Sequence, residues 1–273
     1  MALSKAGLVL GIRPVSSLLP HEQTIPSHVQ KLSAEIGRDL VQKDPIIIDG
    51  ESSVVLDGMH RLAAFDELHV ENTVVCAVDY SSKNVILRRW ARAFTPSARS
   101  STDELLGAAG RMAQTTLASA FSALESKETG WAILTSDAAY LPEGPVQLED
   151  AVAKLKLIDG IAGAKGWGRR FVPEDEVDVP LQDKKSVVVL MRRLGKDDVL
   201  NAAKTGRLFP CKTSMHVIDP RPVAVDFPIT ELNGATSKSL SERLEGKGER
   251  LLPPDSIYGG RRYKERLLLL NQD

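Results

Sequence analysis

The sequence predicts an α/β fold with two domains, and three observations support this. Short apolar runs of strand length, such as 45–48 and 54–56, alternate with longer segments whose apolar residues recur at helical spacing. The chain has 273 residues and 42% hydrophobic content, enough for one large core or two modest ones. Residues 95–102 are rich in Ser, Thr and Pro, which is typical of turns, and they separate two alternating regions. We therefore expect domains over 1–95 and 96–245, followed by a tail over 246–273.

The first region has well-marked elements. They are, in chain order, a strand over 11–19, a helix over 27–40, strands over 45–48 and 54–56, a helix over 58–68, and strands over 73–79 and 85–89. Ser27 and Gln30 are spaced as a capping box at the start of the first helix. Asp49 and Gly50 fit a hairpin-type turn between the second and third strands. The region thus forms a compact α/β unit of about 95 residues, within the usual domain range.

The second region also alternates helices and strands. Its expected elements are an Ala-rich helix over 103–124, a strand over 131–135, a helix over 148–158, a strand over 186–191 and a helix ending at 204. The Gly-rich stretch 160–168 lacks the order of a P-loop, because Lys165 precedes Gly166 and Trp167 follows. We expect a flexible loop or lid there. The charged tail is expected either to dock as a helix or to form an oligomer contact.

The composition excludes several classes of function. With 35 basic and 36 acidic residues the formal net charge is -1, so bulk binding of nucleic acid is not expected. Residues 1–10 carry one Lys and a short apolar run, which predicts neither a secretory signal nor a membrane span. Cys76 and Cys211 lie far apart, and the five histidines show no paired spacing, so a zinc site is not supported. We expect a cytoplasmic protein in a reducing compartment.

The most informative motif is Asp57-Gly58-Met59-His60-Arg61, which joins an expected strand to an expected helix. A glycine at such a turn lets the backbone approach a ligand, and the first N–H groups of the helix carry partial positive charge. His60 and Arg61 add donors, so the anion that best matches this corner is a phosphate. The alternative is a tight strand-to-helix joint with no ligand.

Three other segments carry reactive side chains. They are Pro20-His21-Glu22-Gln23, the stretch Arg88-Arg89-Trp90 with Arg92 and Phe94, and Pro210-Cys211-Lys212-Thr213-Ser214-Met215-His216. The last segment suits a loop that binds phosphate or a polar metabolite, although such a segment taken alone is more often an ordinary polar loop. Glu22 taken alone is typical of a solvated surface carboxylate, Trp90 of a core residue and the arginines of a solvated face, which could also add to an anion pocket.

Taken in order, these motifs resemble the ParB/sulfiredoxin superfamily, and most closely its archaeal free serine kinases. Leu19-Pro20-His21-Glu22-Gln23 is similar to that family's Lys-Pro-His-Glu-Gln segment, and Asp57-Gly58-Met59-His60-Arg61 to its Asp-Gly-His-His-Arg segment. Trp90-Ala91-Arg92-Ala93-Phe94 resembles its Trp-Tyr-Pro-Ala-Phe segment, and Lys212-Thr213-Ser214-Met215-His216 its Lys-Thr-Thr-Arg-His segment. The resemblance covers 12–95 and 200–232, is weak between them and is absent from about the last 40 residues.

The resemblance implies a fold and a reaction. The fold would be a ParB/sulfiredoxin-like N-terminal domain and a second α/β domain, with the active site in the cleft between them. The reaction would be phosphoryl transfer from ADP or ATP, with Mg2+, to free L-serine, giving O-phospho-L-serine. Two alternatives stay open: a kinase of another hydroxyl metabolite, such as threonine or a polyol, and a non-catalytic, ParB-like nucleotide switch.

The resemblance also implies roles for individual residues. Its catalytic residues map onto Glu22 as general base, with Asp57 and His60; its phosphate-binding residues map onto Gly58, Met59, His60 and Arg61; its substrate-binding residues map onto Trp90, Lys212, Thr213, Ser214 and His216.

Two methionines depart from the family's pattern, and they bear on the branch of the superfamily. Met59 replaces a His and Met215 an Arg, beside expected phosphate and substrate contacts. Met59 also argues against the sulfiredoxin branch, because that chemistry needs a cysteine thiolate at this place. The ParB branch comes second, since the sequence has neither a helix-turn-helix pattern nor a basic surface.

Overall fold

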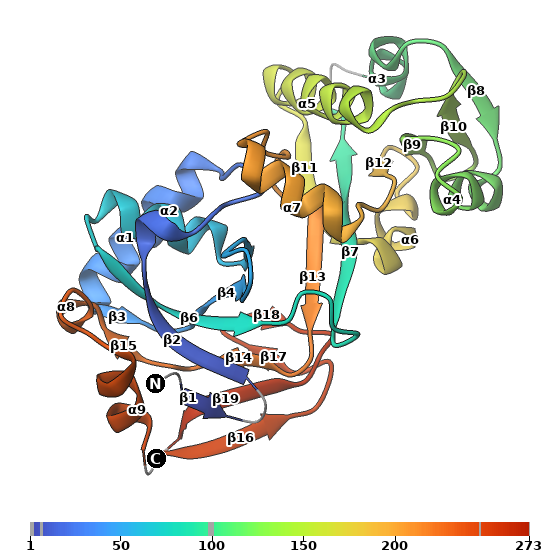
Figure 1. The fold of residues 1–273 in the computed structure, drawn as a ribbon. Helices are drawn as coiled ribbons and strands as arrows, with labels where there is room; N and C mark the ends of the chain where they lie inside the picture. The colour runs from blue at the N-terminus through green and yellow to red at the C-terminus, as the bar shows by residue number, and fades with distance from the viewer. Residues whose placement is uncertain (1–2, 6–7, 98–100, 246, 273) are drawn as a thin grey trace. The chain divides into compact units, whose positions relative to one another are not determined.

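The computed structural model describes residues 3–5, 8–97, 101–245 and 247–272. Packing divides the chain into two compact units, each made of separate segments (Figure 1). Unit 1 contains 1–86, 196–211 and 216–273, and unit 2 contains 87–195 and 212–215. The α/β class expected from the sequence is confirmed. The domain limits at 95 and 245 stay predictions, and the division by packing falls after Ile86.

Unit 1 is built on a five-stranded mixed sheet with the order β1-β2-β6-β4-β5. The strands are β1 Leu3–Lys5, β2 Leu8–Pro14, β4 Ile46–Asp49, β5 Val55–Asp57 and β6 Asn72–Val78. Strand β6 is parallel to β4, and the other neighbours in this order are antiparallel. All four residues of β4 are buried, as expected for a short apolar run with a neighbouring strand on each side.

Two helices of unit 1 pack against each other, and Figure 1 shows them side by side: α1 Pro26–Asp39 and α2 Met59–Glu67. The capping box expected at Ser27 is wrong, because the N-cap is Ile25, two residues earlier, and no side chain caps the helix. Pro26 takes the first helical position, where its fixed φ suits a helix and its missing N–H costs nothing. The strand expected over 11–19 lies instead over 8–14, and the 3₁₀ helix η1, Val15–Ser17, follows it.

The remaining elements of unit 1 come from the C-terminal part of the chain. Strand β3 Val41–Gln42 pairs with β15 Phe227–Pro228, and the helices are α7 Lys196–Thr205, α8 Ile229–Leu232 and α9 Ser237–Leu244. A three-stranded sheet has the order β14 Arg221–Val223, β19 Leu267–Gln272 and β16 Gly248–Leu252. Strands β17 Ile257–Tyr258 and β18 Arg261–Arg262 form a separate two-stranded sheet. Of the two alternatives for the tail, docking as a helix is wrong, since residues 267–270 pair as a strand and their leucines are buried. The oligomer contact stays a prediction.

Unit 2 is built on a seven-stranded sheet with the order β11-β7-β12-β9-β10-β8, in which β13 also pairs with β7. The strands are β7 Val85–Thr95, β8 Met112–Thr115, β9 Trp131–Leu134, β10 Ala139–Pro142, β11 Gly168–Pro173, β12 Val187–Met191 and β13 Ser214–Ile218. The helices are α3 Thr102–Ala109, α4 Leu117–Glu125, α5 Leu148–Ala164, the 3₁₀ helix η2 Glu174–Glu176 and α6 Asp178–Leu181. A buried cluster of alanines, valines and leucines fills the space between sheet and helices.

Two expectations for unit 2 are wrong. The helix expected over 103–124 is broken into α3, β8 and α4, because Gly110 ends α3 at φ 98° and Thr116 caps α4 with its hydroxyl. The Gly-rich stretch 160–168 is not a loop over most of its length. Residues 160–164 continue α5, and Gly168 opens β11. Neither helical glycine in this stretch has a neighbour within 4 Å of the position of an added Cβ.

Candidate active site

The Asp57–Arg61 motif forms the strand-to-helix corner that its sequence predicts. Strand β5 ends at Asp57, Gly58 takes φ 103°, and α2 begins at Met59. The first hydrogen bond within the helix runs from the N–H of Leu62 to the carbonyl of Gly58 at 2.8 Å, so the N–H groups of residues 59–61 precede it. A Cβ on Gly58 would lie 3.3 Å from both Ile46 Cγ1 and Arg61 Nη2. The corner therefore requires glycine for its φ and for its close packing.

Glu22 lies in a loop that is hydrogen-bonded to this corner at two points. The Nδ1 of His21 is 2.7 Å from the carbonyl oxygen of Val55, and the N–H of Ile25 donates to His60 Nε2 at 3.1 Å. The backbone of Glu22 forms an isolated parallel β-bridge with Phe209. Glu22 is only 7% exposed, so it is not the solvated surface carboxylate that Glu usually is. These contacts hold a buried carboxylate next to the start of α2.

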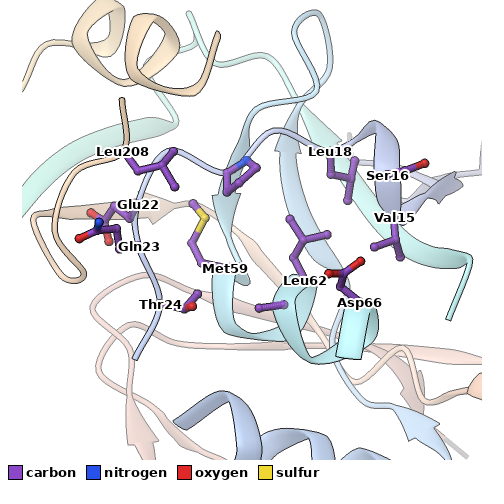
Figure 2. A pocket seen from close by; sticks show the side chains of 12 residues that line it. Val15, Ser16, Leu18, Glu22, Gln23, Thr24, Met59, Leu62, Asp66 and Leu208 are labelled. Atoms are coloured by element: carbon purple, nitrogen blue, oxygen red, sulfur yellow. The ribbon is translucent and has the colours of Figure 1, made fainter. Parts of the chain in front are cut away.

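A pocket of about 710 Å³ opens between this loop and α2. Figure 2 shows Glu22 and Gln23 at one end, Met59 and Leu208 beside them, and Asp66 with Ser16 at the other end. The full lining is Val15, Ser16, Leu18, Pro20, Glu22, Gln23, Thr24, Met59, Leu62, Ala63, Asp66 and Leu208. Its middle is apolar and its ends are polar, the usual character of a small-molecule site. Of the predicted site residues, Glu22 and Met59 line this pocket.

Arg61 is bound within unit 1 by its own neighbours. Its Nη1 donates to the carbonyl oxygens of Asp44 at 2.8 Å and Pro45 at 3.2 Å, and its Nη2 is 3.4 Å from Asp57 Oδ2. It lines a second cavity of about 170 Å³ on the α1 side, rather than the larger pocket. In this arrangement Arg61 fixes the first turn of α2 to β4, and its expected contact with phosphate stays a prediction.

Behind the corner lies a buried group of rings. The Nε2 of His216 is 2.8 Å from the hydroxyl of Tyr80, and the rings of His21 and His216 meet edge to face with centroids 5.4 Å apart. Burial lowers the pKa of His216 well below 6.5, and His21 lowers it further. Burial also lowers the pKa of His21, although Glu22 opposes this shift. His216 is therefore a neutral, hydrogen-bonded ring at neutral pH rather than a cation.

The remaining expected substrate residues lie in unit 2. Trp90 is a half-buried residue of β7, and the Nζ of Lys212 lies 4.7 Å from the centroid of its indole ring. Arg92 donates to the carbonyl of Lys212 at 3.3 Å and pairs with Asp159 at 2.9 Å. Lys212 has φ 59°, and Thr213 and Ser214 after it are buried. The structure thus brings Trp90 and Lys212 together.

Two of the three arginines around Trp90, Arg89 and Arg92, do not belong to a solvated face. Arg89 and Arg92 are 2% and 1% exposed, and each lies against carboxylates of unit 2. Arg89 pairs with Glu125 at 2.7 Å and Glu174 at 2.8 Å. Sequence reasoning missed these acidic partners because Glu125 and Glu174 belong to elements far along the chain. A buried charge needs such a partner, which explains the pairing.

Sequence reasoning also missed Arg221, which begins β14 and contacts the carboxylate of Asp57. It follows Pro220 in a segment with no recognisable motif, so the sequence carries no signal that links it to the corner.

Among the residues that the structure describes, no group of three or more His, Cys, Asp or Glu side chains is arranged to hold a metal ion. Nor does any helix of that part of the chain have the length and apolar character needed to cross a membrane.

The fold is that of free serine kinases. A structure of free serine kinase in complex with AMP matches 81% of this chain and 92% of its own, with a TM-score of 0.66 at 20% identity. A mutant of that enzyme in complex with ADP matches with the same TM-score at 19% identity. The ParB/sulfiredoxin-like fold expected from the motifs is thereby confirmed.

Relatives in sequence agree with this fold. The chain is 26% identical over 230 residues to an ATP-dependent L-serine kinase of Staphylothermus marinus, covering 80% of this chain and 89% of the relative. It is 22% identical over 232 residues to the ADP-dependent L-serine kinase SerK of Thermococcus kodakarensis, with coverage of 80% and 90%. A ParB-like protein of Sulfolobus acidocaldarius is 39% identical over 79 residues, 29% of this chain and 39% of its own length. No known protein-family profile matches the chain.

Proposed function

We propose that this protein is a small-molecule kinase that transfers a phosphoryl group from ADP or ATP to the hydroxyl of free L-serine, giving O-phospho-L-serine. One observation carries the proposal: in a chain similar over 80% of its length to L-serine kinases, the loop with Glu22 is hydrogen-bonded to the Gly58 corner. Phosphoryl transfer to a hydroxyl requires a proton acceptor and an oriented set of donors for the phosphate, and this arrangement supplies both.

Glu22 is the proposed general base. Its carboxylate takes the proton of the serine hydroxyl while the serine oxygen attacks the terminal phosphorus of the nucleotide. The bond from that phosphorus to the bridging oxygen breaks, and the bridging oxygen leaves on AMP when the donor is ADP, or on ADP when the donor is ATP. Because Glu22 is held in a loop anchored to Val55 and His60, its carboxylate needs little reorganisation during the step.

The Gly58 corner is the proposed phosphate site. The N–H groups of residues 59–61 and the positive end of the α2 dipole would stabilise the negative charge that develops on the transferred group. His60 accepts the N–H of Ile25 at Nε2, so a neutral ring carries its proton on Nδ1, which we propose as the donor to phosphate. Asp57 would hold the corner in place through its contacts with arginines.

The pocket of about 710 Å³ is the proposed nucleoside site. The apolar side chains of Leu18, Leu62 and Leu208 would pack on the base, while Ser16 and Asp66 offer hydrogen-bond partners to hydroxyl groups or to the edge of the base. Met59 brings a polarisable thioether to the wall nearest the corner, in place of the histidine of the family's motif.

The corner also fits a magnesium ion that arrives with the nucleotide. Mg2+ is commonly bound through substrate phosphates and one or two carboxylates, keeping several waters, so no protein cage of three ligands is needed. Asp57, with its side chain 30% exposed, is the carboxylate at this corner that could meet the ion through water. When bound, the ion would neutralise charge on the phosphates. Trp90, Lys212, Thr213, Ser214 and His216 remain the predicted contacts of the serine.

A second candidate is a nucleotide-dependent switch without a kinase product. It is favoured by the 39% identity to a ParB-like protein over 79 residues. The two candidates differ in product, because a switch binds or slowly hydrolyses nucleotide and forms no phosphorylated metabolite.

The proposal is tested by incubating the protein with terminally labelled ATP or ADP and, in separate reactions, L-serine, L-threonine or glycerol. We expect label in a phosphoester with L-serine, and a slower reaction with L-threonine, since one methyl group is worth about 1–3 kcal/mol of selectivity. A faster rate with threonine or glycerol would reassign the acceptor. Label only in inorganic phosphate, or none transferred, would favour the switch.

A further inference from the structure

Arg221 is a buried cation that joins three distant segments of unit 1. Its guanidinium donates through Nη2 to the carbonyl of His216 at 2.6 Å, and its Nη1 lies 3.1 Å from Asp57 Oδ2. Its Nε donates to the carboxylate of Glu265. The side chains of Arg221 and Glu265 are 2% and 4% exposed. One planar group thus fixes the residue before Gly58, the backbone at His216 and a carboxylate of the C-terminal tail.

The buried positive charge of Arg221 is balanced by two carboxylates, those of Asp57 and Glu265. Burial alone would lower the pKa of Arg221, but Asp57 and Glu265 outweigh burial and leave its pKa raised. Asp57 is shared, because Arg61 also lies against it at 3.4 Å. Glu265 therefore supplies the second negative charge that a fully buried guanidinium between these partners needs.

The tail places Glu265 by ordinary sheet packing. Glu265 stands just before β19, whose residues Leu267–Leu269 pair in parallel with Arg221–Val223 of β14. Leu267 and Leu270 are fully buried, and Tyr263 lies with its ring 5.6 Å from Arg221 Cζ. The register between β14 and β19 therefore decides where Glu265 meets Arg221.

We propose that Glu265 and Arg221 form a brace that positions Asp57, and with it the phosphate-binding corner at Gly58, so that the C-terminal tail is part of the nucleotide site. Both are positioning residues, since they act on the phosphate through Asp57. This inference rests on the proposed function for its catalytic consequence. Its consequence for nucleotide binding can be measured separately.

The test compares Glu265→Gln with Arg266→Gln. Arg266 is the next residue and makes an ion pair with Asp219 at 2.9 Å, but both side chains are about 40% exposed, so its loss should change little. Affinities for ADP and for adenosine are measured by calorimetry, together with kcat. We expect Glu265→Gln to weaken ADP binding and lower kcat by about 10–100-fold, as happens when a group that orients a metal-binding side chain is removed, with adenosine affinity unchanged. We expect wild-type values for Arg266→Gln.

A double-mutant cycle separates positioning from general support of the fold. If Glu265 acts through Arg221 on Asp57, adding Glu265→Gln to Asp57→Asn should change ADP affinity by less than about twofold further. Equal losses of ADP and adenosine affinity, or multiplicative losses in the cycle, would overturn the proposal. Should Glu265→Gln not fold, Glu265→Asp keeps the charge and withdraws it by one methylene. A smaller loss confined to ADP is then expected, and wild-type binding would overturn the brace.

The same experiment distinguishes failure of the brace from failure of the proposed function. If the wild-type protein binds ADP but makes no phosphoserine, the proposed kinase activity is contradicted. The ADP and adenosine affinities of Glu265→Gln then still show whether Glu265 and Arg221 position Asp57. A wild-type protein that binds neither ligand contradicts both.

Discussion

The Nδ1 of His21 and the carbonyl oxygen of Val55 lie 2.7 Å apart, and this contact connects the loop that carries Glu22 to the strand that leads into the Gly58 corner. His21 is only 1% exposed, so the bond is made in a dry environment. A second contact, from Ile25 to His60, closes the same junction. Glu22 and Gly58, which are 36 residues apart in sequence, are thereby held in one site.

The first prediction concerns Glu22. Replacing it with glutamine keeps its size but removes the proton acceptor, so turnover should fall by about 10²–10⁴-fold, as is usual when a general base is lost. The affinity for ADP should stay near the wild-type value. Glu51→Gln is the matched control, because Glu51 is exposed on the turn between β4 and β5. Steady-state rates and calorimetry check both values, and full activity of Glu22→Gln would remove Glu22 from the mechanism.

The second prediction concerns Gly58. An alanine there would have to keep φ near 103°, at a cost of about 1–2 kcal/mol, and would crowd Ile46 and Arg61 at 3.3 Å. We expect a lower free energy of unfolding and weaker binding of ADP. Gly160→Ala is the control, since Gly160 lies inside α5 with no neighbour within 4 Å of an added Cβ.

The control variant should move in the opposite direction, gaining about 0.5–1 kcal/mol of stability from the higher helix propensity of alanine. Denaturant unfolding of the two variants measures both effects. A Gly58→Ala protein as stable and as tightly binding as wild type would show that the left-handed turn is not needed.

The third prediction concerns pH. The pKa of His216 is lowered by burial and that of His21 likewise, so the unfolded chain binds protons near pH 6.5 that the folded protein does not. Stability contributed by these neutral rings is present above pH 6.5 and is lost as pH falls below it, by up to about 1.4 kcal/mol per pH unit for each ring.

Unfolding measured between pH 7.5 and 5.5, a range of about one unit on each side of the histidine pKa, checks this slope. His216→Gln should reduce the slope, whereas His69→Asn, at an exposed residue with φ 54°, should leave it unchanged. A slope that is the same in all three proteins would mean that the buried histidines do not control acid stability.

The fourth prediction concerns the buried ion pair of unit 2. Arg89 and Glu174 have side chains 2% and 6% exposed and lie 2.8 Å apart. Glu174→Gln should destabilise the protein by up to about 3–5 kcal/mol, because it removes one of the two carboxylates that pair with the buried charge of Arg89, the other being Glu125. The neighbouring Asp175→Asn should cost less than about 1 kcal/mol, because its pair with Arg88 is exposed. Thermal unfolding of the two variants checks the difference, and equal effects would contradict it.

Much of unit 1 could be predicted from the sequence because its signals are local. The apolar run 45–48, the turn at Asp49 and the glycine at 58 each specify their own structure, and β4, β5 and α2 form where they were expected. The helix expected over 103–124 failed because alanine content indicates helix, whereas a single glycine at 110 ended it. Tail residues 267–270 were ambiguous because a short leucine run suits either a helix or a strand until a partner strand decides.

In the candidate site, too, only the residues that belong to local motifs could be found from the sequence. The Gly58 corner and Glu22 could be found from motifs, because each motif keeps its donors or acceptor within five residues. Arg221 and Glu265 could not, since their relation to Asp57 arises only from the pairing of β14 with β19. Residue types alone also suggested that Arg89 and Arg92 are exposed. Only the fold shows that both are buried and paired with carboxylates.

The most direct test of the kinase is ³¹P NMR of the purified protein with Mg2+ and L-serine, in parallel reactions that contain ADP or ATP. We predict a new phosphomonoester resonance that coincides with added O-phospho-L-serine, together with AMP from ADP or ADP from ATP, which also identifies the donor. Nucleotide that binds and stays intact in both reactions, or that yields only inorganic phosphate, would contradict the proposed function.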